Sequence, residues 1–308
     1  MRRLDVTAAC GAVCGHARAV IFIIMKMIMR KVTFYTGIAL VALTLSVSCS
    51  DSVRRSAAML RAAANAAPAD IRTESGQTVG GDGLLLAATP DTVPSIILER
   101  EGYVTSYNKR TRLPNWVAWH LTAGHTKGSH NRRGMDFAED EDVPAPRADD
   151  WDYYNSGYDR GHMCPAGDNK WSRDAMRQSF LFTNICPQDP GLNRGDWNEM
   201  ENACRSWARE KGDIYIVCGP ILHKGRHKTI GKHKVVVPDA FFKVVLCMNG
   251  NPKAIGFIYK NRDGNRPKGD YVNTVDEVER ITGIDFFASL PDDVERAVES
   301  SADLDDWE

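Results

Sequence analysis

Short runs of apolar residues, separated by glycine, proline and polar turns, follow one another from residue 95 onward. The first three runs, 95–98, 103–108 and 116–121, are rich in β-branched and aromatic residues and predict strands. Segments 103–107 and 116–121 would pair as a hairpin across residues 108–115. Further apolar runs predict four later strands, at 213–220, 235–238, 240–248 and 254–259.

The sequence predicts helices in three places. Asn193, Trp197, Glu201 and Arg205 recur every four residues, which places them along one face of a predicted helix. The chain therefore mixes strands with helices. The other two predicted helices are 274–281, which starts with the capping-box pattern Thr-Val-Asp-Glu, and 292–300.

The amino-terminal segment has a different pattern, in which a continuous apolar run follows positive charges. The run 32–47 comes after Met29-Arg30-Lys31 and before Ser48-Cys49-Ser50, which is the arrangement of a secretory signal. Segment 45–49 resembles a bacterial lipoprotein cleavage box that would leave Cys49 lipidated and membrane-anchored, although Ser46 departs from that pattern. A membrane-spanning anchor is the alternative, for which 16 apolar residues are short.

These patterns divide the chain into four parts. We expect a signal peptide at 1–49, with a true start between Met25 and Met29, and export to the cell envelope (periplasm or outer membrane) or secretion. Segment 50–94 is rich in Ala, Gly, Ser, Thr and Pro and predicts a flexible linker. The folded domain is expected at 95–300, and the acidic residues 301–308 are expected to be disordered.

The net charge of −1 gives no indication of a nucleic-acid partner, but the charges are unevenly distributed. Segment 203–272 has 14 Lys or Arg against five Asp or Glu, whereas 273–308 has 12 acidic residues against two Arg. Segment 136–152 has eight acidic residues against one Arg and predicts a solvated acidic loop that a phosphate polymer would avoid. Loop 224–234 is basic, and its cations are predicted to bind a polyanionic substrate: Lys224, Arg226, Lys228, Lys232 and Lys234.

The cysteines bear on the compartment and on metal binding. Cys10 and Cys14 would be removed with the signal peptide and Cys49 would be modified. Five cysteines remain, and this odd number permits at most two disulfides and leaves one free thiol. No CxxC or His-rich spacing is present, which argues against a structural zinc site. The five remaining cysteines are Cys164, Cys186, Cys204, Cys218 and Cys247.

The densest set of chemically active residues lies between 158 and 205. It contains Asp159-Arg160-Gly161-His162, then Thr183-Asn184-Ile185-Cys186-Pro187-Gln188, then Asn193-Arg194-Gly195-Asp196-Trp197 followed by Glu201 and Arg205. These spaced blocks resemble the signature of the DNA/RNA non-specific endonucleases. That ββα-metal family includes secreted bacterial sugar-non-specific nucleases and mitochondrial endonuclease G. The resemblance extends more thinly over about residues 95–290.

The resemblance implies both a fold and an activity. The fold would be α+β, a ββα-metal (His-Me finger) nuclease fold with a central antiparallel sheet and flanking helices. The activity would be hydrolysis of DNA and RNA phosphodiester bonds with little sequence preference, leaving 5′-phosphate ends. Mg²⁺ would be the cofactor, with Mn²⁺ as the alternative, and a homodimer is implied by other members of the family.

The resemblance also assigns roles around the metal. His162 is expected to be the general base, because an imidazole with an ordinary pKa of about 6.5 accepts a proton from water at neutral pH. Asn193 is expected to bind the metal through its amide oxygen, but it can equally cap the following helix. Glu201 is expected to hold a metal-bound water with Arg205 in support, and Arg205 is also expected to bind the substrate. The pair would otherwise be a surface ion pair.

Two arginines are expected to act on the phosphate. Arg160 would contact it because a guanidinium matches two phosphate oxygens at once. A second transition-state arginine is assigned to Arg132, with Arg133 as the alternative. Only the spacing to Phe137 decides between these two.

The other motif residues are expected to shape the site. Asn184 would position the catalytic loop. Gln188 would do the same near the substrate, or be an ordinary polar loop residue. Asp159 would orient the turn, Gly161 would let the backbone bend, and Trp197 would lie in the core.

Two interpretations from other functional classes remain open. A catalytically idle nucleic-acid-binding module would keep the same scaffold, although the presence of His162, Asn193 and Glu201 favours an enzyme. A thiol hydrolase is suggested by Cys164 and Cys186, which follow His162 and Asn184 by two residues. Chelation would stop a metal-dependent nuclease, whereas iodoacetamide would stop a thiol hydrolase.

Overall fold

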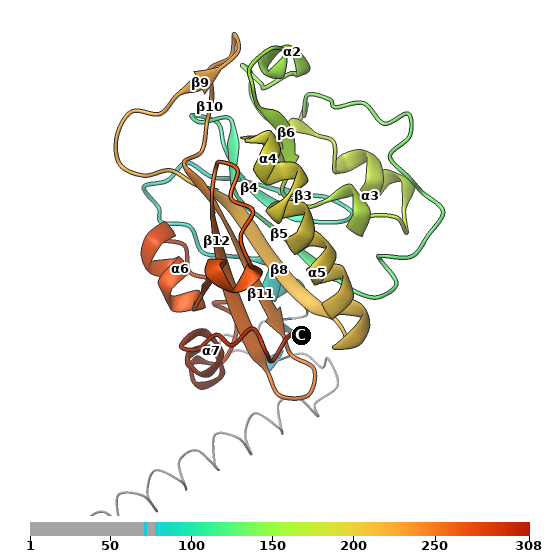
Figure 1. Cartoon of the computed structure of the whole chain (residues 1–308), viewed down its shortest axis with the longest axis vertical. Helices are drawn as coiled ribbons and strands as arrows, with labels where there is room; N and C mark the ends of the chain where they lie inside the picture. Colours follow the sequence, from blue (N-terminus) through green and yellow to red (C-terminus); the bar gives the residue numbers. More distant parts are fainter. Residues whose placement is uncertain (1–70, 73–77, 80) are drawn as a thin grey trace, which may run out of the picture. The chain divides into compact units, whose positions relative to one another are not determined.

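A seven-stranded antiparallel sheet forms the centre of the computed structural model, which describes residues 71–72, 78–79 and 81–308 (Figure 1). The strand order is β13-β12-β11-β8-β5-β4-β3. The predicted signal peptide with Cys49, and most of the predicted linker, lie outside the described residues. The strands are β3 Ile96–Glu99, β4 Val104–Asn108, β5 Leu113–Leu121, β8 Ile214–Ile221, β11 Ala240–Cys247, β12 Lys253–Lys260 and β13 Val272–Asn273.

Helices cover both faces of this sheet, which explains why its central strands are apolar throughout. On one face, helix α5 (Asp196–Glu210) packs its buried residues against alternate side chains such as Phe241 and Val245. On the other face, α6 (Val275–Thr282) and α7 (Asp292–Glu299) pack against the intervening side chains. The prediction of an α+β fold with a central antiparallel sheet and flanking helices is therefore confirmed.

The polar motif lies on a smaller antiparallel pair. Strand β6 (Asp159–His162) pairs with β7 (Ile185–Gln188), and the chain then passes through α4 (Pro190–Arg194) into α5. A Cβ on Gly161 would lie 2.2 Å from the Gln188 Oε1 atom, so the close approach of this side chain requires glycine. This ββα unit presents the motif residues at one end of α5 (Figure 1).

The remaining elements are short. The predicted strand at 235–238 is only two residues long and belongs to a separate ribbon with β9, outside the central sheet. Within the described residues, no helix combines the length and apolarity needed to cross a membrane. The short elements are β1 Ile71–Arg72, β2 Thr78–Val79, η1 Gly81–Leu85, α2 Asp150–Tyr153, η2 Ala166–Asp168, α3 Arg173–Gln178, η3 Phe182–Asn184, β9 Thr229–Ile230, β10 Val235–Val236 and η4 Lys268–Tyr271.

Two predicted boundaries are wrong because apolar side chains at both ends are buried. In the predicted linker, Ala87 is buried and the Thr89 hydroxyl accepts a hydrogen bond from the Trp116 indole at 2.8 Å. In the predicted disordered tail, Trp307 is 1 % exposed and packs on Trp207 with 4.8 Å between ring centroids. The acidic composition of the tail concealed this single aromatic anchor.

Replacing Trp307 with alanine is expected to destabilise the protein by about 3–5 kcal/mol, the usual cost of removing a buried aromatic side chain. Urea unfolding followed by far-UV circular dichroism measures the change. Trp151, which is 76 % exposed, is the matched control, and its replacement should cost at most about 0.5 kcal/mol. Equal small losses in both variants would contradict the packed position of the tail.

Candidate active site

A surface cavity of about 330 Å³ lies where β6, α4 and the first turns of α5 meet. Five of the predicted site residues line it together, although they come from separate parts of the chain. Three further lining residues were not predicted for the site: Pro165, Arg194 and Asn198. The complete lining is Arg132, Arg160, His162, Pro165, Asn193, Arg194, Asn198 and Glu201.

His162, the last residue of β6, has a ring nitrogen without a partner. Its Nε2 atom is shielded from bulk solvent and forms no hydrogen bond within the protein. The ring contacts Phe180 edge-on at 4.9 Å between centroids, and the His162 carbonyl accepts a bond from the Trp197 indole. Burial, with the nearby positive charge of Arg132, lowers the pKa of His162 to about 3. The imidazole is therefore neutral at physiological pH, which is the protonation state that a general base requires.

Asn193 is oriented by Asp159. Its Nδ2 atom donates to the Asp159 carboxylate at 2.9 Å, and Arg194 donates to the same carboxylate at 2.7 and 2.8 Å. Burial alone would raise the pKa of Asp159, but the hydrogen bonds from Arg194 and Asn193 lower it. Because the amide nitrogen faces Asp159, the opposite amide atom, Oδ1, remains as an acceptor. Asp159 thus does more than orient a turn.

The predicted single helix through Asn193 and Glu201 is interrupted at Gly195. Asn193 belongs to α4, whose N-cap is Asp189, and the N-cap of α5 is Gly195. A Cβ on residue 195 would lie 2.7 Å from the Gly191 carbonyl oxygen, so this turn requires glycine. The alternative that Asn193 caps the following helix is therefore wrong.

Glu201 and Arg205 belong to a buried network and do not form an exposed pair. The Arg205 Nη1 atom lies 2.8 Å from the Asp168 carboxylate. Its distance to the Glu201 carboxylate is longer, at 3.9 Å. Arg205 does not line the cavity, so its predicted contact with substrate is not supported by its position. Burial raises the pKa of Glu201 to about 7, although Lys243 and Arg205 oppose this shift.

Lys243, which was not predicted for the site, lies directly beneath this network. It is fully buried in β11, and its ammonium group lies 4.3 Å from the Trp197 ring centroid and 5.0 Å from that of Trp119. Burial alone would lower the pKa of Lys243. The nearby thiols of Cys218 and Cys204, together with the carboxylates of Glu201 and Asp168, raise it instead. One sequence signal pointed to it: a lone lysine within the apolar run 240–248.

The two predicted phosphate arginines both line the cavity. Arg160 donates to the Asp150 carboxylate at 2.5 Å, and its guanidinium lies 5.5 Å from the Phe137 ring centroid. Arg132 is exposed and lies over the Phe180 ring. Arg133 is not part of the lining, so the geometry favours Arg132 of the two alternatives.

Asn184 and Gln188 are fully buried and do not reach the cavity. The Asn184 amide binds both the N–H and the carbonyl of Cys164 at 2.9 Å, which fixes the backbone two residues after His162. This contact fits the predicted positioning role. The prediction of Gln188 as a substrate-binding residue is wrong, because its side chain is buried against Gly161.

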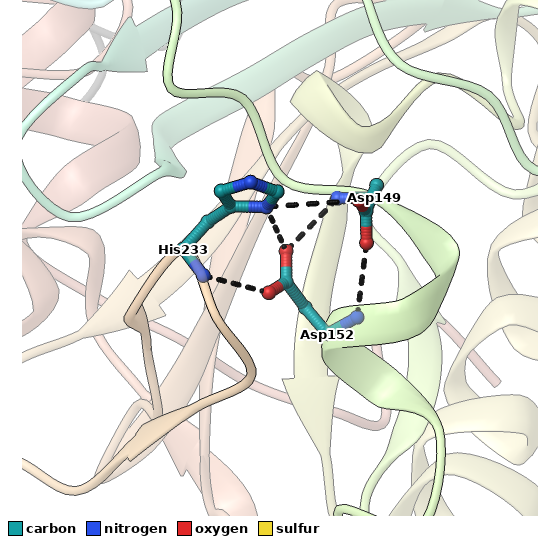
Figure 2. A group of neighbouring side chains, drawn as sticks. All are labelled: Asp149, Asp152 and His233. Atoms are coloured by element: carbon teal, nitrogen blue, oxygen red, sulfur yellow. Dashed lines mark hydrogen bonds and ion pairs between the residues drawn. The ribbon is translucent and has the colours of Figure 1, made fainter.

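The basic loop 224–234 is fixed by a cluster of Asp149, Asp152 and His233, which we call the His233 clasp (Figure 2). Asp152 accepts bonds at 2.9 Å from both the backbone N–H and the Nδ1 atom of His233. It also forms a reciprocal capping box with Asp149. Because both Asp152 oxygens already have partners, the clasp is a structural link between α2 and the loop.

The five cations of the basic loop are exposed, and none lines the cavity. The Lys228 ammonium group lies 4.7 Å from the Tyr158 ring, which immediately precedes β6. One cation of the loop therefore lies beside the residue that precedes β6, although the loop does not line the cavity.

The predicted solvated acidic loop at 136–152 is wrong for its inner carboxylates. Asp140 is buried, binds Arg100 at 2.7 Å and accepts the Thr183 hydroxyl at 2.5 Å. Asp152 is buried in the His233 clasp, and Asp150 holds Arg160. Composition alone does not distinguish these paired carboxylates from solvated ones.

All five predicted mature cysteines are buried and unpaired. Burial raises the pKa of Cys164 and of Cys186 well above the ordinary thiol value. Thiols in this state are poor nucleophiles. The environment of these residues therefore argues against a thiol hydrolase.

The cavity fits a hard divalent cation. Asn193 Oδ1 and the Glu201 carboxylate are oxygen donors, which Mg²⁺ and similar ions prefer. A hydrated ion needs few protein ligands, and the cavity has room for its waters. His162, whose Nε2 atom has no hydrogen-bond partner within the protein, lines the same cavity.

Comparison with known proteins agrees with this geometry. The family profile described as DNA/RNA non-specific endonuclease matches residues 86–293. Nuclease C1 of Cunninghamella echinulata var. echinulata is 38 % identical over 209 residues, covering 63 % of this chain and 83 % of that protein. Human mitochondrial endonuclease G is 34 % identical over 205 residues, covering 62 % of this chain and 69 % of that protein.

A solved structure shares the fold. A chain in the crystal structure of the EndoG/EndoGI complex superposes with a TM-score of 0.61 at 31 % sequence identity. The match covers 64 % of this chain and 89 % of that chain. Sequence and fold comparisons thus lead to the same group of proteins.

Proposed function

Because this chain belongs to the DNA/RNA non-specific endonuclease family, whose members use a divalent metal, we propose that its cavity performs metal-dependent hydrolysis with His162 as general base. The protein is a hydrolase that cleaves DNA and RNA without sequence specificity. One observation carries the proposed mechanism: His162, Asn193 and Glu201 converge on a single cavity. Mg²⁺ is the proposed ion, with Mn²⁺ as the alternative.

In the proposed mechanism, the neutral His162 Nε2 accepts a proton from a water molecule as its oxygen attacks phosphorus. The P–O3′ bond breaks, so the products are a 5′-phosphate and a 3′-hydroxyl that takes up a proton. The bound divalent cation would neutralise charge on the phosphate and on the leaving oxygen. Asn193 and Glu201 would hold this ion and its water, while Arg132 and Arg160 bind the negatively charged phosphate oxygens.

The lack of sequence preference has a physical basis in this cavity. Its lining includes Arg132, Arg160 and Arg194, whose guanidinium groups can bind the phosphate backbone, and contacts to the backbone carry no sequence information. We further propose that the basic loop extends this backbone contact. The His233 clasp attaches the loop to α2, and Lys228 of the loop lies over Tyr158, the residue before β6.

A plasmid-nicking assay tests the proposed metal dependence directly. The purified protein should nick and then degrade supercoiled DNA in Mg²⁺, and EDTA should stop the reaction. Iodoacetamide should have no effect, because the cysteines are buried. Cutting that continues in EDTA would refute the metal-dependent mechanism, and binding without cutting would support the idle module.

Replacing Lys228 with glutamine is expected to weaken DNA binding similarly for all sequences. The slope of log K against log salt should fall by about one, since one phosphate contact is lost. Fluorescence anisotropy between low and moderate salt measures this slope. Lys211, at the far end of α5, is the control position and should leave the slope unchanged. An unchanged slope for Lys228→Gln would contradict the role of the loop.

Export also remains a proposal that rests on the sequence pattern of residues 29–50. We propose that the protein is delivered to the cell envelope or secreted, with Cys49 as a lipid attachment point. Labelling of expressing cells with a radioactive fatty acid, comparing the wild type with Cys49→Ser, tests the lipid attachment. Equal labelling of both proteins would exclude it.

A further inference from the structure

A second group of acidic side chains lies far from the cavity, between α6 and α7. Asp276 and Glu279 come from α6, and Glu299 is the last residue of α7. One carboxylate oxygen from each lies within 4.8 Å of the other two. We call these three residues the α6–α7 carboxylates. They lie on the sheet face opposite α5, so they are separate from the active site.

Glu299 is the member that most needs a partner. The residue is only 4 % exposed, and its Oε1 atom is shielded from solvent without any hydrogen-bond donor. It also lies at the carboxyl end of its helix, where the helix dipole disfavours negative charge. An unpaired buried carboxylate is costly, so the fold retains it at the expense of stability unless something neutralises it.

No cationic side chain performs this task among the residues that the structure describes. None of the α6–α7 carboxylates forms an ion pair with Lys, Arg or His there. Arg280, on the same helix as two of them, is instead held by Glu277 at 2.6 Å. The Glu279 carboxylate receives one backbone N–H, from Phe286 at 2.7 Å.

The carboxylates also oppose one another electrostatically. Burial, followed by the charges of Glu279 and Glu295, raises the pKa of Glu299 to about 9. Burial likewise raises the pKa of Glu279 to about 7. A cation bound between the three carboxylates would offset both the cost of burial and their mutual repulsion.

We propose that Asp276, Glu279 and Glu299 bind a Ca²⁺ ion that joins α6 to α7. Oxygens that bind Ca²⁺ at about 2.3–2.6 Å lie at most about 5 Å apart, which matches the observed spacing. Ca²⁺ accepts irregular sets of oxygens, whereas Mg²⁺ requires a near-ideal octahedron. Asp276 is exposed, so the ion can enter from solvent and complete its shell with water.

Thermal unfolding of the full chain tests this site. After treatment with EDTA and its removal, the transition temperature is measured with and without CaCl₂ for the wild type and for Glu299→Gln. Without Ca²⁺ the variant should be the more stable protein, because glutamine can be buried without first neutralising a carboxylate. At Ca²⁺ about one hundred times above the dissociation constant, the wild type should gain about 5–10 °C more than the variant.

Controls separate this site from the active-site ion. Ca²⁺ bound in the active-site cavity would shift both proteins equally, so the difference between them reports only the α6–α7 carboxylates. Asp276→Asn should also reduce the Ca²⁺ shift, Glu277→Gln should not, and Mg²⁺ should produce a smaller difference. Nicking activity in Mg²⁺ should be the same for the wild type and Glu299→Gln.

Equal Ca²⁺ shifts in the wild type and in Glu299→Gln would overturn the proposal. In that case the cluster shares protons and does not bind a cation. The variant would then still be more stable than the wild type at neutral pH, but by an amount that Ca²⁺ does not change.

Discussion

Replacing His162 with alanine is expected to lower the cleavage rate by about 100-fold to 10,000-fold, the usual contribution of a general base. His162 lines the cavity, its Nε2 atom has no partner within the protein, and burial keeps the ring neutral. Affinity for DNA should change little, because the arginines and the basic loop supply the phosphate contacts. Single-turnover cleavage together with anisotropy-based binding separates the two effects.

The same variant should show an altered dependence of stability on pH. The pKa of His162 is about 3 in the folded protein and about 6.5 in an unfolded chain. The unfolded state therefore binds more protons between these values, and wild-type stability falls as pH falls from about 6.5. His162→Ala should lose less stability than the wild type over this interval in urea unfolding.

Exposed His223 is the matched control, and His223→Ala should cut DNA at the wild-type rate. Loss of DNA binding in His162→Ala, with folding intact, would contradict the general-base role. Cleavage within a few-fold of the wild type would contradict it as well.

Local sequence patterns predicted most of the sheet, because its strands are short apolar runs separated by turns. The β4–β5 hairpin forms as expected, although β5 starts at Leu113 and shortens the connection. The ends of the domain could not be predicted in this way. The positions of Ala87 and Trp307 depend on tertiary packing against a distant strand and helix, and neither lies in a periodic segment.

The sequence motifs correctly identified most of the residues that line the candidate site. The cavity is lined together by five of the predicted residues: His162, Asn193, Glu201, Arg160 and Arg132. Spacing on an ideal helix could not reveal the interruption at Gly195, which turns Asn193 toward Asp159 and away from a capping position.

Residues deeper in the fold were missed for a different reason. Lys243 and Asp168 act through pairings between segments about 40 to 75 residues apart, and such contacts leave no local pattern. Gln188 and Arg205 were placed at the substrate because they belong to the blocks that resemble the family signature. In the structure, Arg205 is paired with Asp168, and the Gln188 side chain is buried.

Replacing Asn193 with alanine is expected to raise the metal concentration for half-maximal cleavage by at least about 100-fold. The Asn193 amide oxygen is one of few neutral ligands in a cavity that also holds Arg132, Arg160 and Arg194. These positive charges oppose a cation, so the loss of one oxygen donor has a large effect. Cleavage at saturating Mg²⁺ should recover toward the wild-type rate, because His162 is unchanged.

Asp159→Asn provides a graded comparison for the same titration. The variant keeps Asn193 but removes the carboxylate that orients its amide, so the metal requirement should rise by about 10-fold to 100-fold. Asn202, which pairs with Arg205 outside the cavity, is the control, and Asn202→Ala should titrate like the wild type. If Asn193→Ala shows the wild-type Mg²⁺ dependence, Asn193 is not a metal ligand. If only Asp159→Asn is normal, the amide is oriented by the metal itself and not by this carboxylate.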